Sequence, residues 1–358
     1  MNSPKDKQKK KDLGIFYTPR EVVDFIFSIL NILKQKEDKE TQRWQSRKPK
    51  PHYPSVIDPA CGEGIFLKKA IESGFTGYHP TYKSPYIFGV DIDEDVVKDW
   101  EKLSILSLFH NNKKMMNKHF FGQNGLLELP DHKLPYKKSE DGLFRFDAVV
   151  GNPPYGGIGV DFKKEKTKEA IKLLETLKNF EIFGFKKVKH YKEKMSIDLG
   201  GRKHHEITLF DQISLSDSIK IKKNKKENYK ISISEVANIA QGMPIEILFV
   251  ERFIQLAKPG GWIAIIIPDG ILANSQLHYV REFIAKKTKV LGIVSLPRDT
   301  FKKVGTGAKT SILFLQKYKE KDKIDIDYPV FLASIKKAEK KYFDKISDAF
   351  KNFYYEKF

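Results

Sequence analysis

Residues 56–64 read Val-Ile-Asp-Pro-Ala-Cys-Gly-Glu-Gly, and this stretch decides the predicted fold. The two β-branched residues predict a short buried strand that ends at Asp58. The glycines predict a tight turn, and the apolar spacing that follows predicts a helix over 65–73. A strand, a glycine-containing turn and a helix in this order are typical of a parallel α/β sheet, in which ligands bind beyond the carboxyl ends of the strands.

The alternation of strands and helices continues along the chain on both sides of this stretch. Further strands are expected over 87–90, 146–150, 262–267, 290–296 and 311–315, with a turn over 259–261 before the third of them. Helices are expected after Thr18-Pro19, from Asp93, and over 169–180, 246–257 and 277–286, whereas the polar residues 35–54 predict a loop. This order predicts an α/β fold with a Rossmann-like, doubly wound, mostly parallel sheet.

A basic segment over 156–241 interrupts this order. Residues 162–230 contain 19 Lys or Arg against 10 Asp or Glu, an excess of 19 − 10 = 9 positive charges, which is nearly half of the net charge of +19. We interpret 156–241 as an insertion into a main domain over 13–317, between a disordered basic arm (1–12) and a C-terminal docking or capping segment (318–358) with helical spacing near 335–350. Its lysine cluster is expected to contact the backbone phosphates of a polyanionic partner: Lys222, Lys223, Lys225 and Lys226.

Composition limits the class of protein. The chain has 65 Lys or Arg against 46 Asp or Glu, which favours a polyanionic partner, although a Lys-rich genome accounts for such a charge equally well. The only cysteine, Cys61, excludes an internal disulfide. The longest apolar stretch, over 262–267, is too short to cross a bilayer, and no apolar run follows the basic N-terminus as in a signal peptide. We therefore expect a cytoplasmic protein that makes no membrane contact.

The loop over 58–64 is a candidate ligand site, with a simple tight turn as the alternative. It lacks the Lys-Ser/Thr of a phosphate-binding loop. Asp58 and Glu63 would repel a pyrophosphate, but they can accept hydrogen bonds from an ammonium group. We therefore expect a ligand with a cationic end.

The end of the second predicted strand completes this candidate site. An acidic residue there is the usual acceptor for ribose hydroxyls, which assigns that role to Asp91. Ile92 would offer an apolar face to an adenine ring, and Asp93 is interpreted as the cap of the next helix. A nucleoside ligand is therefore expected.

The most specific motif is Asn152-Pro153-Pro154-Tyr155, directly after a predicted strand. An aromatic exocyclic amine is a poor nucleophile, and two acceptors on its hydrogens favour a nitrogen whose lone pair is available. The Asn152 side chain and the Pro153 carbonyl can be these acceptors, and proline brings no competing N–H. Tyr155 supplies a face on which a base can stack. The motif therefore predicts methylation of an exocyclic amine on a base that has been flipped out of the duplex.

These motifs together resemble those of the gamma-class N6-adenine DNA methyltransferases. The similarity is closest to the methylation subunits of type I restriction-modification systems and to the methylase domains of fused type II enzymes. The matching segments, in the family's order, are 16–19, 58–64, 90–93, 152–155, 260–270 and 307–311. The resemblance implies the class I S-adenosylmethionine methyltransferase fold and transfer of a methyl group from S-adenosylmethionine to the N6 amine of adenine in DNA, within a restriction-modification or related defence system.

The resemblance also implies a role for each matching residue. The implied cofactor residues are Tyr17, Thr18, Asp58, Ala60, Gly62, Asp91, Ile92 and Asn124, the last of which stands where the family usually has Asp. The implied catalytic residues are Asn152, Pro153 and Tyr155, and the implied target-base residues are Tyr155, Phe301 and Lys309. Phe301 is equally well interpreted as a core residue.

The resemblance leaves the target and the partners open to alternatives. A methyltransferase of RNA or of protein glutamine, and a non-catalytic DNA-binding subunit, are the competing readings. Because no segment predicts a target-recognition module, we expect double-stranded DNA and a specificity subunit, or a linked recognition domain, as partners. We expect no metal site, since His204-His205 lacks a completing ligand set, and no nucleophilic role for Cys61.

Overall fold

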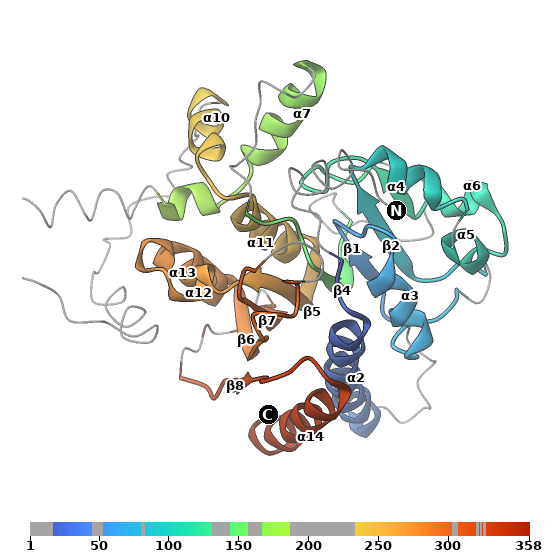
Figure 1. Ribbon diagram of the computed structural model, residues 1–358, viewed down its shortest axis with the longest axis vertical. Coiled ribbons are helices and arrows are strands. Elements are labelled where there is room, and N and C mark those ends of the chain that lie inside the picture. Colours follow the sequence, from blue (N-terminus) through green and yellow to red (C-terminus); the bar gives the residue numbers. More distant parts are fainter. Residues whose placement is uncertain are drawn as a thin grey trace, which may run out of the picture.

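The computed structural model describes residues 17–44, 53–79, 83–102, 104–130, 144–156, 167–186, 233–302, 307–319, 322, 324 and 327–358. Their strands form one sheet in the order β3-β2-β1-β4-β5-β7-β6-β8. The strands are β1 (Val56–Asp58), β2 (Ile87–Asp91), β3 (Phe120–Gly122), β4 (Phe146–Gly151), β5 (Ala257–Pro268), β6 (Thr288–Ser295), β7 (Thr310–Lys317) and β8 (Phe331–Ser334). Only β7 runs antiparallel to its neighbours in this sheet, so the predicted mostly parallel sheet is confirmed (Figure 1).

Helices cover both faces of this sheet. They are α2 (Arg20–Trp44), α3 (Ile65–Glu72), α4 (Glu94–Asp99), α5 (Ser104–Leu108), α6 (Lys113–Met116), α7 (Thr167–Leu177), α10 (Ile233–Gln241), α11 (Ile245–Leu256), α12 (Gly270–Ala273), α13 (His278–Lys287) and α14 (Lys340–Lys357), with a 3-10 turn at Ser275–Leu277. The helices expected over 65–73, 169–180, 246–257 and 277–286 thus correspond to α3, α7, α11 and α13.

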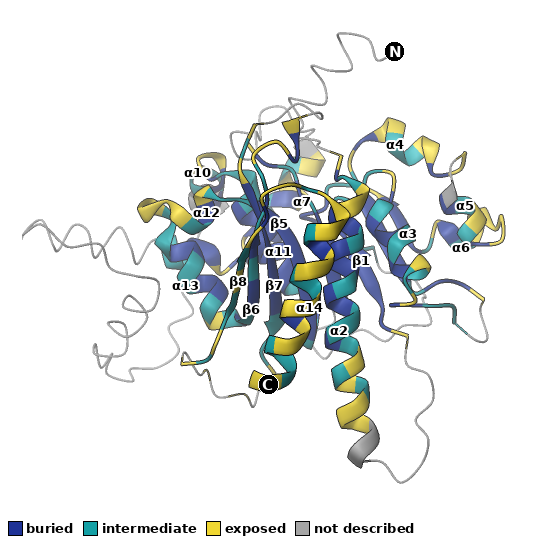
Figure 2. Cartoon of the chain, turned by 60° about the horizontal axis from the view of Figure 1, so that its bottom comes forward, coloured by how far each residue is buried: buried dark blue, intermediate teal, exposed yellow. Residues whose placement is uncertain are grey.

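The alternation of side chains along β5 divides the core between the two faces. Ile263, Ile265 and Ile267 belong to a first core cluster with α7, α10, α11 and α13. Ala264 and Ile266 belong to a second core cluster with α2, α3 and α14. Because successive side chains of a strand point to opposite faces, a strand covered on both sides must be apolar throughout, as β5 is. Figure 2 shows α2 and α14 lying side by side on the second face.

The predicted loop over 35–54 is wrong for its first ten residues, because α2 continues to Trp44. The extension is rich in Lys, Glu and Asp, which favour helices when opposite charges are four residues apart. Lys34 pairs with Asp38 at 2.7 Å, and the Lys36 ammonium donates to the Tyr354 carbonyl at 3.2 Å. The polar residues 35–44 therefore form the end of a helix, not a loop.

The predicted turn at 259–261 also lies inside a strand. β5 begins at Ala257, and its pairing with β4 is irregular here, since Phe146 pairs with Ala257 and Ala148 pairs with Trp262. β3 and β8, which have only three and four residues, were not predicted from the sequence. Short edge strands carry too few residues for an alternating pattern to appear.

The C-terminal segment and both ends of the insertion are part of the core. β8 extends the sheet beside β6, and Phe343 and Phe350 of α14 are buried in the second core cluster. Leu173 and Leu177 of α7 and Val236 of α10 are buried in the first core cluster. The basic arm (1–12), the four lysines at 222–226 and His204-His205 lie outside the described residues.

Candidate functional site

The predicted site residues of the segments 58–62, 91–92, 124 and 152–155 lie at one edge of the sheet, where β1, β2, β3 and β4 end. These strands are parallel neighbours, so the loops that follow them meet at their carboxyl ends. The Asp93 carboxylate accepts a hydrogen bond from the Asp95 N–H at 3.0 Å and caps α4, which confirms its predicted role as a cap.

The loops after β1 and β2 are joined by hydrogen bonds. The Gly62 N–H donates to Asp91 Oδ2 at 2.7 Å, and the Cys61 N–H donates to the Val90 carbonyl at 2.8 Å. Asp91 Oδ1 accepts from the Asp93 N–H at 2.9 Å. The Ala60 N–H donates to Asp58 Oδ1 at 3.0 Å. Both carboxylates are therefore fixed by backbone donors before any ligand arrives.

This pair of loops leaves room for a ligand. Gly62 adopts a positive φ of 51°, and a Cβ placed on it would meet no atom within 4 Å. The Ile92 side chain is 48% exposed, which is unusual for an isoleucine beside a buried strand. An open turn, a fixed carboxylate and an exposed apolar face fit the ribose and adenine of a nucleoside.

The electrostatics of this pair of loops favour a cation. Burial raises the pKa of Asp58 to about 8, because the Ala60 N–H offsets only part of the loss of water and Asp91 lies nearby. Burial likewise raises the pKa of Asp91, against hydrogen bonds from the N–H groups of Asp93 and Gly62. Burial and the same two carboxylates raise the pKa of the Cys61 thiol well above its usual value, which leaves it a poor nucleophile. A ligand with a positive charge would relieve this repulsion between buried carboxylates.

A third loop, residues 123–128, follows β3 and lies beside Asp91. The Gln123 N–H donates to the Asp91 carbonyl at 2.9 Å. The Asn124 side-chain oxygen accepts from the Leu126 N–H at 3.0 Å, and Gly125 packs directly against the Pro59 carbonyl. Asn124 therefore lies next to the loops after β1 and β2, and its contact with an adenine stays a prediction.

The motif 152–155 follows β4 at the same edge. A Cβ on Gly151 would come within 2.6 Å of Asp58 Oδ1, so the start of this loop lies against the buried carboxylate of the first loop. Pro153 is buried, and Tyr155 is only 3% exposed. Burial raises the pKa of Tyr155, a hydrogen bond with the Asn152 side chain opposes this shift, and Glu246 adds to it. The loop is thus a packed part of the sheet edge.

The motif residues Asp269, Lys309 and Ser311 lie together where β5 ends and β7 begins. The Ser311 hydroxyl donates to Asp269 Oδ1 at 2.7 Å, and Lys309 pairs with Asp269 Oδ2 at 3.4 Å. The Lys309 side chain is 42% exposed and can reach a ligand in solvent. Phe301, in contrast, is fully buried in the second core cluster, as the alternative of a core phenylalanine requires, so its ring offers no face to a base in this structure.

Tyr17 is 40% exposed and Thr18 is 8% exposed just before α2, and their cofactor contacts stay predictions.

The sequence analysis missed three charged residues of α11. Arg252 and Glu251 are 0% and 2% exposed. Burial raises the pKa of Glu251 to about 7, although the N–H groups of Ile182 and Glu181 donate to it at 2.9 and 2.7 Å. Glu246 accepts from the Gly156 N–H, and burial raises its pKa. The one signal in the sequence is a pair of adjacent charges within an apolar helix.

Among solved structures, this fold is similar to that of a protein from Listeria monocytogenes assigned to the class I S-adenosylmethionine-dependent methyltransferases. The TM-score is 0.50 and the sequence identity 19%, covering 94% of this chain and 71% of that chain. The likeness supports the predicted class I methyltransferase fold. The sequence model of the N-6 DNA methylase family matches residues 5–196 and 202–357, and the chain belongs to this family. The match confirms the resemblance that the motifs indicated.

Further similarities are weaker or local. A protein from Vibrio vulnificus described as the modification subunit of a type I restriction enzyme has a TM-score of 0.49 and 18% identity, covering 97% of this chain and 55% of that chain, and no conclusion rests on it. A stretch of 70 residues, 20% of this chain, is 30% identical to 3% of the Defense against restriction protein B of Escherichia phage P1. The chain thus spans about half of the modification subunit and a small part of the phage protein.

Two structural features are absent from the described residues. No helix among them is long and apolar enough to cross a membrane. No group of three or more His, Cys, Asp or Glu side chains in that part of the chain is arranged to hold a metal ion.

Proposed function

We propose that this chain transfers a methyl group from S-adenosylmethionine to the N6 amine of adenine in double-stranded DNA, as part of a restriction-modification or related defence system. The observation that carries the proposal is the contact between the two halves of the site, in which Gly151, at the start of the Asn-Pro-Pro-Tyr loop, lies against Asp58 of the cofactor loop. Membership of the N-6 DNA methylase family supports the choice of target atom.

The cofactor site is assigned to the loops at the ends of β1, β2 and β3. Asp91 accepts from the ribose hydroxyls, Ile92 packs on the adenine ring, and Asn124 contacts the adenine amine. Asp58, with its neighbours Ala60 and Gly62, faces the cationic methionine end, which Tyr17 and Thr18 close over. When bound, S-adenosylmethionine supplies a methyl group on a positively charged sulfur, which is already a good electrophile.

The catalytic loop acts on the target amine by position and electrostatics. The Asn152 side-chain oxygen and the Pro153 carbonyl accept the two amine hydrogens, which turns the nitrogen lone pair toward the methyl group. No strong base is needed, because the protein gains most by fixing the two reactants in line. Tyr155 stacks on the flipped base, and since its ring is 3% exposed, its neighbours must move when the base enters. Lys309, whose side chain is 42% exposed, contacts the base.

Selection of a DNA site is assigned to a specificity subunit or a linked recognition domain. Reading a sequence needs side chains on base edges in a groove, whereas basic residues on phosphates carry no sequence information. The described strands all belong to one sheet, and no segment predicts a target-recognition module. The lysines at 222–226 would then add affinity without specificity.

The test is methyl transfer from radiolabelled S-adenosylmethionine to long duplex DNA, to RNA and to a protein mixture, with N6-methyladenine identified by mass spectrometry. We expect label in the adenine of DNA alone, at a low rate for the chain by itself and at a higher rate once a specificity partner is added. The control is Asn152→Ala. Label in RNA or in protein glutamine would replace the proposal by one of the alternative targets, and no transfer to any of the three, with the partner present, would favour a non-catalytic role.

A further inference from the structure

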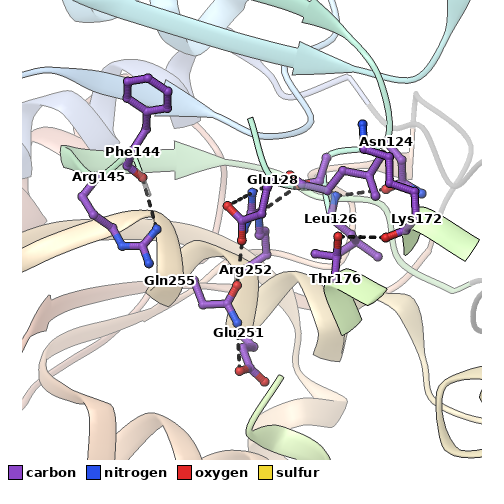
Figure 3. A network of polar contacts seen from close by, with 12 residues as sticks. Asn124, Leu126, Glu128, Phe144, Arg145, Lys172, Thr176, Glu251, Arg252 and Gln255 are labelled. Carbon is purple, nitrogen blue, oxygen red and sulfur yellow. Dashed lines mark hydrogen bonds and ion pairs between the residues drawn. The ribbon is translucent and has the colours of Figure 1, made fainter. Parts of the chain in front are cut away.

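Arg252 lies at the centre of a buried polar network between α11 and the loop 123–128 (Figure 3). Its side chain is 0% exposed, in the middle of a helix packed against β4 and β5. A buried guanidinium is costly unless its donors are satisfied, so its partners indicate what holds it there.

Every donor of this guanidinium has an acceptor. Nε donates to the Gly125 carbonyl at 3.3 Å, and Nη2 donates to the Leu127 carbonyl and to Glu128 Oε2. Nη1 donates to Glu128 Oε1 at 2.9 Å and to the Gln255 side chain at 3.3 Å. These contacts use the five N–H groups that a guanidinium has, so the arrangement needs arginine and cannot be reproduced by lysine.

Most of these acceptors belong to the loop that carries Asn124. The Gln123 side chain donates to the Glu128 carbonyl at 3.0 Å and closes the same loop. The Gln123 N–H in turn reaches the Asp91 carbonyl, and Gly125 rests on Pro59. Arg252 therefore binds the loop from the side of α11. On its other side the loop contacts the loops after β1 and β2.

We propose that Arg252 is a positioning residue for the adenine end of the cofactor: it fixes the loop 123–128 so that Asn124 stands beside Asp91. Arg252 does not touch the cofactor itself. The inference rests on the proposed cofactor site. It adds a residue, on the α11 side of the loop 123–128, that sets the affinity for the cofactor and the selectivity for its adenine.

The experiment compares binding of two probes by calorimetry: S-adenosylhomocysteine and its analogue in which hydrogen replaces the adenine amino group. The variant is Arg252→Met, which keeps the length and apolar stem of the side chain but removes its five donors. We expect the Kd of S-adenosylhomocysteine to rise at least about tenfold, the Kd of the analogue to rise less, and kcat at saturating cofactor to change little.

Two variants guard against a purely structural explanation. Arg252→Met with Glu128→Gln also removes the carboxylate, 37% exposed, that the single variant leaves without its partner, and the same two Kd values are measured in it. Arg281→Met is the matched control, because Arg281 donates to the Ile271 and Asn274 carbonyls, both at 2.9 Å, and so ties a different loop. It should leave the ratio of the two Kd values as in the wild type.

A ligand-free readout separates this inference from the proposed function. Amide hydrogen exchange over 123–128 should speed up at least tenfold in Arg252→Met and stay unchanged in Arg281→Met. If the wild type binds no S-adenosylhomocysteine but the exchange still rises, the proposed cofactor fails while the loop-positioning role stands. The inference is overturned if the wild type binds S-adenosylhomocysteine and the Arg252 variants keep the wild-type ratio of the two Kd values and the wild-type exchange rates. It is also overturned if these variants raise the Kd of both probes by the same factor.

Discussion

Binding of the cofactor should release a proton from Asp58. Burial raises the pKa of this carboxyl to about 8 in the ligand-free site, so most molecules carry it protonated at pH 7. A cationic ligand end stabilises the carboxylate, and Asp58 must then lose its proton on binding. Asp91 and Cys61 are the titratable groups that face it, and the pKa of each is raised above its usual value as well.

The magnitude follows from this pKa. A group with a pKa near 8 is about 90% protonated at pH 7, so binding should release about 0.9 proton per ligand, and the apparent Kd should fall about 25-fold between pH 6 and pH 7.5. The upper limit keeps the ligand's own amino group, with an ordinary pKa of about 7.7–8.0, largely protonated. The assay is calorimetric titration with S-adenosylmethionine in two buffers of different ionisation enthalpy, whose heats differ in proportion to the protons released.

Asp58→Asn is the control variant, because an amide oxygen can still accept from the Ala60 N–H while no proton titrates. It should abolish most of the release and flatten the pH dependence. The stability of the ligand-free protein gives an independent check: a folded pKa raised above the ordinary 3.8 means that stability is lost as pH rises toward about 8, and the variant should remove that loss. Proton release that is unchanged in Asp58→Asn would refute the reasoning.

Four further outcomes are expected. Asn152→Ala should lower kcat on the order of 10²-fold and leave the cofactor Kd nearly intact, because its oxygen acts on the target amine; retained turnover would remove Asn152 from the catalytic loop. Asp91→Ala should weaken cofactor binding by about 1.5–3 kcal/mol in calorimetry, and an unchanged Kd would exclude it as the ribose acceptor. Gly62→Ala should cost about 1–2 kcal/mol in denaturant unfolding, since φ is 51°, and it should also raise the cofactor Kd because its Cβ points into open space; an unchanged Kd would argue against a ligand there. Replacing four lysines by Gln should flatten the salt dependence of DNA binding by a slope of about 0.9 per lost phosphate contact, and an unchanged slope would mean that they only face solvent: Lys222, Lys223, Lys225 and Lys226.

The loops of the site could be predicted because their chemistry is local. A buried strand that ends in Asp58 and turns through glycines needs only a few neighbouring residues to be recognised, and the same holds for Asp91 and for Asn152-Pro153-Pro154-Tyr155. A parallel sheet then brings these strand ends together without further information. The elements that were missed carry little local signal: β3 and β8 are short, and the polar end of α2 is helical because of ion pairs and its packing against α14.

Phe301 marks the limit of predicting a role from a motif. Its position in the sequence is compatible with a base-stacking role and with a core role. Which role it has depends on the face of the sheet against which the segment around Phe301 packs. It is fully buried against the second face, with residues of α2 and α14 in the same cluster. That environment is built from segments more than 250 residues apart in the chain, which no local pattern records.

Arg252 could have been noticed but not understood. In α11, apolar residues occupy every side of the helix, and a helix that is apolar all round is buried. Because such a helix has no solvent face, Glu251 and Arg252 must both find partners inside the protein. Those partners lie 70 and 127 residues away along the chain, in the segment after α7 and in the loop after β3. The sequence therefore predicts that two buried charges need partners, whereas only the fold identifies the loop 123–128 as what Arg252 holds, and a change at this buried position should alter a ligand that Arg252 never contacts.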